Sequence, residues 1–293
     1  MANSNGWGDG AANNAIGWGQ GANNNIGWGS SHATSWAGAT DIVGLTTDAD
    51  AQAFITAAAI TDPTQQTAIN NLVVGMKADG VWTKMKAIYP FVGGTATTHK
   101  YNLKDPRDLD AAFRLVFNGG WTHSSTGATP NGTNGYADTK LIPSSVLSQN
   151  STHISSYIRN TSQGVLLGTD NLFRLWIAPN FNGTQKYVEI NSGITTTPST
   201  TISTATGLWL GSRIVSSESK LYNSSSLNYT AVRASSGLDN LSMFISARNT
   251  ITPSNYSSSQ VAFSSLGDGL TDTEAANLYT RVQAFQTSLS RQV

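Results

Sequence analysis

The sequence predicts a mainly β protein, built as an antiparallel sandwich or jelly roll with helices near its ends. Three observations lead to this prediction. From residue 81 onward, short apolar runs alternate with Gly, Asn, Ser and Pro, as in short strands joined by turns. Only 12% of the residues are charged, about half of the usual share in a globular domain. The abundance of Ser, Thr, Asn and Gly suits strands and turns better than helix bundles.

Composition also excludes several classes of protein. The chain has 17 Lys and Arg against 17 Asp and Glu, and this zero net charge argues against nucleic-acid binding, which needs a basic face. No run of about 18 apolar residues occurs, so no membrane span is expected. Cysteine is absent, which removes disulfides and thiolate chemistry. No cofactor is expected.

Residues 1–46 are predicted to be a docking arm. The motif Gly-Trp-Gly recurs around Trp7, Trp18 and Trp28, and Ile16 and Ile26 precede the second and third tryptophan by two residues. Gly- and Asn-rich composition by itself is typical of a flexible linker. The regular recurrence of tryptophan favours docking, because each indole buries about 200 Å² in a partner pocket and flanking glycines permit close approach.

Residues 47–92 are predicted to be a helical connector. The first helix covers 47–60. The second follows the capping residue Asp62, which precedes a proline at the first helical position, and it ends at Gly80. Both helices carry an apolar stripe. The stripes have two interpretations: they pack against the β domain, or they pack against copies of themselves in an oligomer.

Residues 93–293 are predicted to form the sandwich, closed by a C-terminal helix. That helix begins at a capping box, Thr271 to Glu274. One face of it carries an apolar stripe made of Leu278, Val282, Phe285 and Leu289. Candidate strands are read from short apolar runs bounded by turn residues. They occupy 82–89, 112–117, 154–159, 164–168, 172–177, 186–190, 208–214, 229–233 and 243–247.

Four runs of the sequence resemble a known family. They are WTKMKAIYP at 82–90, GGTATTHKYNLKDPRDLDAAFRLVF at 93–117, GGWTHSSTGATPNGTNGYADT at 119–139 and LGDGLTDTEAANLYTRVQAFQTSL at 266–289. These runs resemble structural proteins of tailed bacteriophages that infect Bacteroidetes, including crAss-like phages. The resemblance covers most of residues 48–293, and the last run is its most specific part.

The resemblance implies a concanavalin A-like (laminin-G-like) jelly-roll sandwich carried by a virion appendage. The appendage is a head fibre or a tail fibre, with the head fibre favoured, assembled in the host cytoplasm as a homotrimer and displayed on the particle surface. The repeat in residues 1–46 looks like the virion-anchoring end of such proteins, so its partner is expected to be another capsid or tail protein. Host-surface glycans are the expected external partner, and neither nucleic acid nor a membrane is expected.

Three aromatic residues are the glycan-binding candidates. Sugar sites combine an aromatic face with Asn, Asp and Gly groups on loops, and such residues adjoin Trp121, Tyr136 and Trp209. Each of the three also fits a position in the core or in a turn.

A capsular-polysaccharide depolymerase is the alternative function. Glycoside hydrolysis needs two carboxylates about 5–10 Å apart. The glutamates are Glu189, Glu218 and Glu274, and Glu189 has no acidic partner on its own predicted strand. The four histidines lack the spacing of metal ligands, so no metal site is predicted. We therefore expect no catalytic residues and a protein that is not an enzyme.

Overall fold

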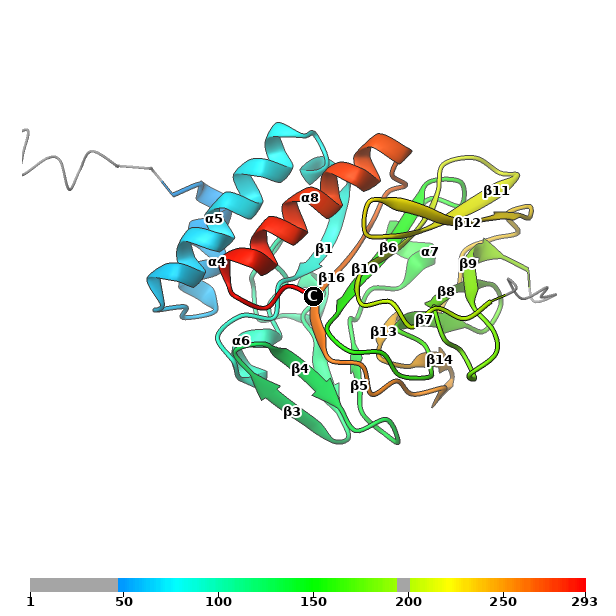
Figure 1. Ribbon diagram of the computed structural model, residues 1–293, viewed down its shortest axis with the longest axis horizontal. Helices are drawn as coiled ribbons and strands as arrows, with labels where there is room; N and C mark the ends of the chain where they lie inside the picture. The colour runs from blue at the N-terminus through cyan, green and yellow to red at the C-terminus, as the bar shows by residue number, and fades with distance from the viewer. Residues whose placement is uncertain (1–46, 194–200) are drawn as a thin grey trace, which may run out of the picture. The chain divides into compact units, whose positions relative to one another are not determined.

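Two β-sheets pack face to face, and helices α4, α5 and α8 lie on the outer face of the first sheet (Figure 1). The structure, a computed structural model, describes residues 47–193 and 201–293. The predicted fold class is confirmed: the described chain is mainly β, a sandwich of two sheets with helices before it and a helix at its end. The N-terminal arm lies outside the described residues.

Helices α4 (Ala49–Ala57) and α5 (Pro63–Ala78) form as the sequence predicts. The Asp62 carboxylate accepts a hydrogen bond from the backbone N of Gln65, which satisfies one of the free amides at the start of α5. Gly80 follows the helix with a φ of +72°, a conformation that glycine adopts without strain. Local capping chemistry therefore sets both ends of α5.

Helix α8 (Asp272–Ser288) begins at the predicted capping box. The Thr271 hydroxyl accepts from the backbone N of Glu274, and the Glu274 carboxylate accepts in return from the backbone N of Thr271. Glu274 also forms an ion pair with Lys84 at 2.6 Å. The cap thus connects α8 to the segment that leads into the first strand.

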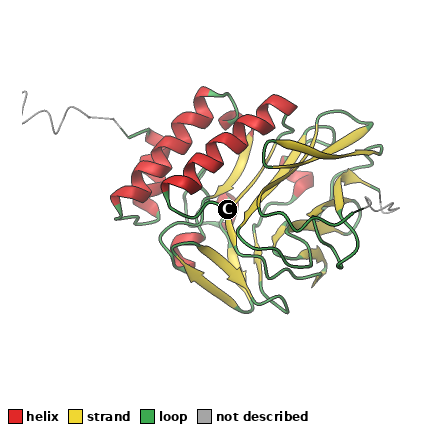
Figure 2. Cartoon of the chain, viewed as in Figure 1, coloured by secondary structure: helices red, strands yellow, loops and turns green. Residues whose placement is uncertain are grey.

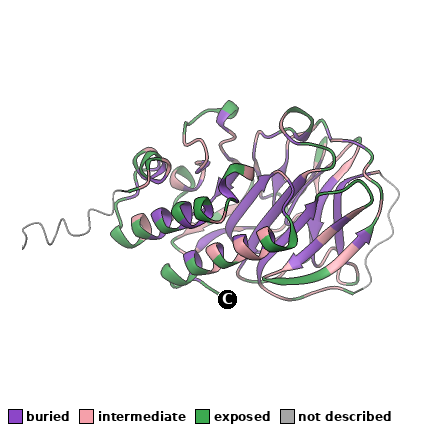
Figure 3. Ribbon diagram, turned by 90° about the horizontal axis from the view of Figure 1, so that it is seen from above, coloured by how far each residue is buried: buried purple, intermediate pink, exposed green. Residues whose placement is uncertain are grey.

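The apolar stripes of α4, α5 and α8 bury themselves against the first sheet and against one another. Figure 3 shows the buried faces of these helices turned toward the strands. The predicted connector is therefore part of the same compact unit as the sandwich, which covers Asp48–Val293. Because the stripes are buried within one chain, they no longer support an oligomer, and the homotrimer stays a prediction.

The first sheet has eight strands, and its central strands β6 and β16 are buried along their whole length. Strand β1 (Met85–Tyr89) pairs with β16. Across the sheet the others run in the order β12 (Ser226–Val232), β11 (Glu218–Asn223), β10 (Gly207–Arg213), β6 (Thr152–Ile158), β16 (Val261–Gly267), β4 (Gly127–Pro130) and β3 (Trp121–Ser124).

The second sheet also has eight strands. Strand β8 (Arg174–Ala178) pairs with β7, and β9 (Tyr187–Ser192) pairs with β8. The pair β14–β7 is parallel. The remaining order is β15 (Thr252–Ser254), β14 (Arg248–Thr250), β7 (Leu167–Asp170), β13 (Phe244–Ile245), β5 (Tyr136–Asp138) and β2 (Val116–Asn118).

Between the sheets lies an apolar core, to which Ile154 and Trp209 contribute from the first sheet and Leu175 and Ile190 from the second. The long helices lie on the far side of the first sheet (Figure 2). On the outer face of the second sheet a small aromatic cluster packs instead, made of Val165, Trp176, Ala178, Tyr187 and the partly buried Phe181. None of the described helices combines the length and apolar character that a membrane crossing requires.

Two predicted strands overlap a 3-10 turn at their start. The run 82–89 opens with the 3-10 turn η2 (Trp82–Lys84), and only its second part is strand. The run 112–117 overlaps the 3-10 turn η3 (Asp110–Ala112), after which Phe113 takes a left-handed φ of +60°. Short helices α6 (Ala96–His99) and α7 (Pro143–Val146) complete the fold. Apolar runs alone do not separate a tight turn from a strand.

The centre of the first sheet holds a buried histidine. His153 is fully buried, and its Nδ1 lies 2.6 Å from the carbonyl O of Asp268. A carbonyl can only accept, so Nδ1 carries the proton and Nε2 accepts from the Ser265 hydroxyl at 3.2 Å. Burial lowers the pKa of His153 from 6.5 to about 4.

Acid is therefore expected to destabilise this protein through His153. The neutral ring stabilises the fold fully above pH 6.5, and this contribution is lost as the pH falls to about 4, with a total near 3 kcal/mol. Urea unfolding at several pH values between 4 and 7 measures the loss. His153→Gln should be less stable at pH 7 and show a shallower pH dependence. An equal slope in both proteins would contradict the assignment to His153.

Candidate functional site

The predicted docking residues Trp7, Trp18, Trp28, Ile16 and Ile26 lie outside the described residues. The docking arm therefore stays a prediction. The other candidate residues all lie in the sandwich.

Trp209 is fully buried in the core between the two sheets. Its indole Nε1 donates to the carbonyl O of Ala205 at 3.1 Å, so the polar end of the ring is also satisfied inside the protein. A sugar platform needs an exposed ring face. The prediction of glycan binding at Trp209 is therefore wrong, because the pleat of β10 turns this side chain inward.

Trp121 and Tyr136 come close together at the corner of strands β3 and β5. The Trp121 Nε1 donates to the carbonyl O of Asn118 at 3.1 Å and lies 3.3 Å from that of Tyr136. The Trp121 ring packs edge to face against Phe117, with centroids 5.2 Å apart, and the Tyr136 ring stacks on Phe244 at 4.4 Å. Both half-buried rings thus contribute to packing at this corner, and glycan binding by them stays a prediction.

The outer face of the second sheet carries a different group of side chains. Leu175 and Ile177 of β8 point into the core, so the residues that alternate with them point outward. Aromatic rings and ionised groups meet on this face, and we call them the outer-face cluster. Its members are Asp170, Arg174, Trp176, Glu189 and Arg248.

Strand register arranges the outer-face cluster in two rows. Gly168 lies between Arg248 and Trp176 in the first row, and Glu189 follows as the partner of Trp176. Asp170 and Arg174 form the second row. Because Gly168 has no side chain, the Arg248 guanidinium reaches over the Trp176 ring, 5.4 Å from its centroid. A Cβ at Gly168 would lie 2.4 Å from the Cβ of Trp176.

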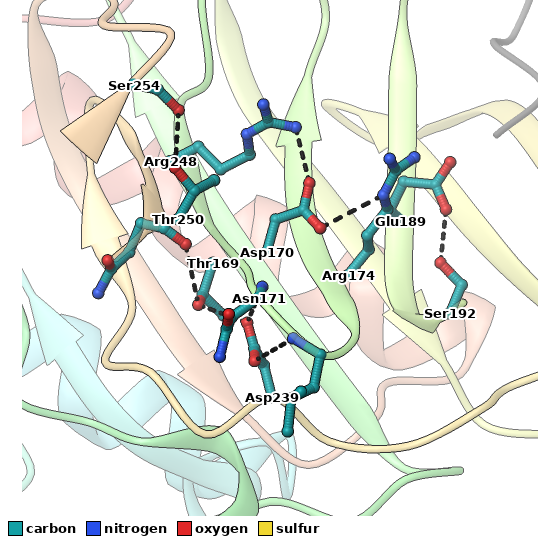
Figure 4. A network of polar contacts seen from close by, with 12 residues as sticks. Thr169, Asp170, Asn171, Arg174, Glu189, Ser192, Asp239, Arg248, Thr250 and Ser254 are labelled. Carbon is teal, nitrogen blue, oxygen red and sulfur yellow. Dashed lines mark hydrogen bonds and ion pairs between the residues drawn. The ribbon is translucent and has the colours of Figure 1, made fainter. Parts of the chain in front are cut away.

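The Asp170 carboxylate lies between two guanidinium groups (Figure 4). Its Oδ2 accepts from Nη1 of Arg248 at 2.7 Å, and its Oδ1 is 3.4 Å from Nε of Arg174. Burial raises the pKa of Asp170, although both arginines act in the opposite direction. Burial also lowers the pKa of Arg248. Partial desolvation thus strengthens the electrostatic interactions of this group.

Glu189 is held in a second ion pair. Its carboxylate accepts from the Ser192 hydroxyl at 2.5 Å and pairs with the guanidinium of Arg233. The sequence offered no acidic partner on the same strand. The sheet supplies one from another strand, because Asp170 on β7 lies on the same face, across β8.

A buried carboxylate fixes the turn beside the cluster. Asp239 accepts from the Thr169 hydroxyl at 2.7 Å and from the backbone N of Asn171 and Leu172 at 2.9 and 3.1 Å (Figure 4). Because its oxygens are occupied, Asp239 anchors the turn between β7 and β8 and is not free for a ligand. Leu172, in this turn, is 52% exposed.

Three members of the outer-face cluster have buried hydrogen-bond donors without a partner. They are Nε of Arg174, Nε of Arg248 and the indole Nε1 of Trp176. In the part of the chain that the structure describes, the other unpartnered buried side-chain atoms are His99 Nε2, Asn191 Oδ1 and Ser246 Oγ. Half of these atoms therefore gather in one cluster, where native proteins seldom leave a donor unpaired.

Residues 47–193 and 201–293 contain no group of three or more His, Cys, Asp or Glu side chains placed to hold a metal ion. The outer-face cluster provides guanidinium and indole donors, which are not metal ligands.

No protein-family model matches the chain, and no curated protein matches it by sequence. Several solved structures have a similar arrangement. One is a sialidase of Trypanosoma rangeli in complex with 2,3-difluorosialic acid, which is 11% identical to this chain with a TM-score of 0.46. The match covers 73% of this chain and 38% of the sialidase. Another is domain 4 of AbnA, a GH43 extracellular arabinanase from Geobacillus stearothermophilus, in complex with arabinotriose. It has 13% identity and a TM-score of 0.43, covering 67% of this chain and 98% of the domain.

The comparisons correct one expectation from the sequence, namely that the chain is not an enzyme. Proteins with a similar fold include sialidases and a domain of an arabinanase, and a third example is a mutant of the Trypanosoma rangeli sialidase displaying trans-sialidase activity, at 11% identity and a TM-score of 0.45. At these identities the likeness concerns the fold. The chain also spans about two fifths of the length of these sialidases, 38% and 39%.

A strained residue borders the outer-face cluster. Ile251, in the turn after β14, has a φ of +73° and is 74% exposed. β-Branched residues seldom adopt this left-handed conformation. Since β14 and β7 are parallel neighbours, Ile251 and Leu172 lie in turns at the same end of the sheet.

Replacing Ile251 by Asn is expected to stabilise the protein by about 1 kcal/mol, because Asn tolerates the left-handed conformation and little apolar contact is lost. Urea unfolding at neutral pH measures the change. Leu227→Asn is the matched control, since Leu227 is 51% exposed on β12 and has no such φ; no gain is expected there. An unchanged or lower free energy of unfolding for Ile251→Asn would show that the turn is not strained.

Proposed function

We propose that this chain is a structural protein of a phage virion appendage, a head fibre in preference to a tail fibre, whose sandwich binds carbohydrate. The sequence resemblance of residues 48–293 supports the virion assignment. The outer-face cluster carries the binding assignment, because its donors beside aromatic rings have no partner among the described residues and favour a ligand that supplies acceptor oxygens. Saccharides present many such oxygens.

Carbohydrate binding is expected to depend on Asp170. This carboxylate orients Arg174 and Arg248, so Asp170→Asn should weaken binding about tenfold by releasing both guanidinium groups. Binding of the full chain to immobilised neutral and acidic saccharides measures the effect. The matched control is Asp110→Asn, which also removes an aspartate paired with arginine, but one that is 57% exposed. If wild type binds no saccharide, the proposed function fails.

Attachment to the virion is expected to depend on residues 1–46. Residues 48–293 form their own compact unit, so deletion of the arm should leave the thermal transition unchanged. Both the deletion and the triple variant Trp7→Ala, Trp18→Ala, Trp28→Ala should fail to join particles, because truncated aromatic anchors typically cost about 2 kcal/mol or more each. Quantifying the protein in purified particles tests this. Normal incorporation of both variants would show that the arm is only a linker.

Polysaccharide cleavage is a second candidate function, supported by a specific observation. Asp170 and Glu189 lie on one face, two strands apart, which separates their strands by about 10 Å, and they are also offset by two residues along the strands. This backbone separation is larger than the about 6.5–9.5 Å between the carboxyl groups of an inverting pair, so the two side chains would have to lean toward each other. Burial raises the pKa of Asp170, as a general acid requires. Binding is the first candidate because both carboxylates are held in ion pairs. Release of reducing ends that Asp170→Asn abolishes would favour cleavage instead.

A further inference from the structure

We infer that the outer-face cluster recognises a carboxylate-bearing saccharide through Arg174 and Arg248. This inference rests on the proposed carbohydrate-binding function and names the class of its ligand. It follows from the supply of donors, from the balance of charge and from the apolar border of the cluster.

The free groups of the cluster are all donors. A guanidinium group and an indole N–H have no lone pair to offer, so the missing partner must be an acceptor. The side chain of Arg174 has no hydrogen bond of normal geometry to any described residue, and its one ionic contact is the long 3.4 Å approach to Asp170. The Nε atom of Arg174 is buried, so a ligand oxygen meets this guanidinium at its outer Nη groups, in the part of the side chain that is exposed.

The positive charge of the arginine side chains favours a negatively charged ligand over a neutral hydrogen-bond acceptor. Arg174 and Arg248 share one carboxylate, Asp170, so their ion pairs leave one of the two guanidinium groups without a carboxylate of its own. The side chains of Arg174 and Arg248 are 14% and 18% exposed, which reduces the screening of this charge by water. A planar guanidinium fork matches a carboxylate with two parallel hydrogen bonds.

The border of the cluster favours a sugar over a small free anion. Leu172 lies two residues before Arg174 and Ile251 three residues after Arg248, and both expose apolar surface at the same end of the sheet. An acidic sugar has a charged carboxylate together with an apolar C–H face. It therefore fills both the charged and the apolar part of this surface, whereas an inorganic ion fills only the first.

The test compares carboxylated polymers with the same polymers after the carboxyl groups have been reduced to alcohols. Polygalacturonate, alginate, hyaluronate and polysialate serve as probes, with dextran sulfate as an anion without carboxylate. We expect the full chain to bind at least one carboxylated polymer and to lose about tenfold or more in affinity for its reduced form. Dextran sulfate should bind more weakly than that polymer.

Variants of the two arginines locate the site. Arg174→Gln and Arg248→Gln should each weaken binding of the carboxylated polymer about tenfold. Arg248→Lys keeps the charge but loses the fork, so it should fall between wild type and Arg248→Gln. The matched control Arg107→Gln removes one positive charge at a side chain that is 64% exposed and paired with Asp105, and it should bind as wild type. A thermal transition confirms that each variant is folded.

Each result that departs from these expectations overturns a different part of the proposal. Equal binding of native and reduced polymers overturns the carboxylate inference but leaves carbohydrate binding intact. Equal or tighter binding of dextran sulfate overturns the inference in favour of general attraction to anions. Carboxylate-dependent binding that is unchanged in both arginine variants places the site elsewhere and overturns it too. If no carboxylated polymer binds while a neutral saccharide does, the inference fails alone; if no saccharide binds, the proposed function fails with it.

Discussion

The pairing of β6 with β16 is the interaction on which the rest of the structure depends. Both strands are buried on both faces, by the inter-sheet core on one side and by the helices on the other. Their serines fit this crowded position, since Ser155 and Ser265 bond to each other at 2.7 Å, 110 residues apart in sequence. The fold therefore closes only when the C-terminal part of the chain joins the sheet, which makes this a fold dominated by non-local contacts.

Buried arginines show how the interior treats positive charge. Arg291 is fully buried and donates to the carbonyl oxygens of Pro90, Phe91 and Ala262 at 2.7 to 2.9 Å, while burial lowers its pKa to about 9. Arg213 is satisfied in the same way by backbone carbonyls of four residues. Where this protein uses arginine for structure, it supplies acceptors. Arg174 lacks them, which separates it from the structural arginines.

Local signals in the sequence predicted the helices, whereas the cluster and some strands depend on distant contacts. The capping residues Asp62 and Thr271 sit where the sequence predicted helix starts, because a cap needs only neighbours along the chain. Strand β16 was missed because its run VAFSSLG contains two adjacent serines and lacks alternation. The outer-face cluster combines four strands between residues 167 and 250, so no spacing in the sequence reveals it. The available signal was the alternation Arg-Leu-Trp-Ile in β8, which places a charge and an indole on one face.

The same packing that stabilises the sandwich also restricts where a ligand can bind. Helices α4, α5 and α8 occupy the outer face of the first sheet, and the inter-sheet core occupies both inner faces, so the second sheet offers the remaining face. The chain has zero net charge, and no general field draws anions to it. The proposed affinity for an acidic saccharide therefore rests on short-range contacts with Arg174 and Arg248. Because geometry contributes more than charge in such contacts, this surface is suited to distinguish a planar carboxylate from other anions.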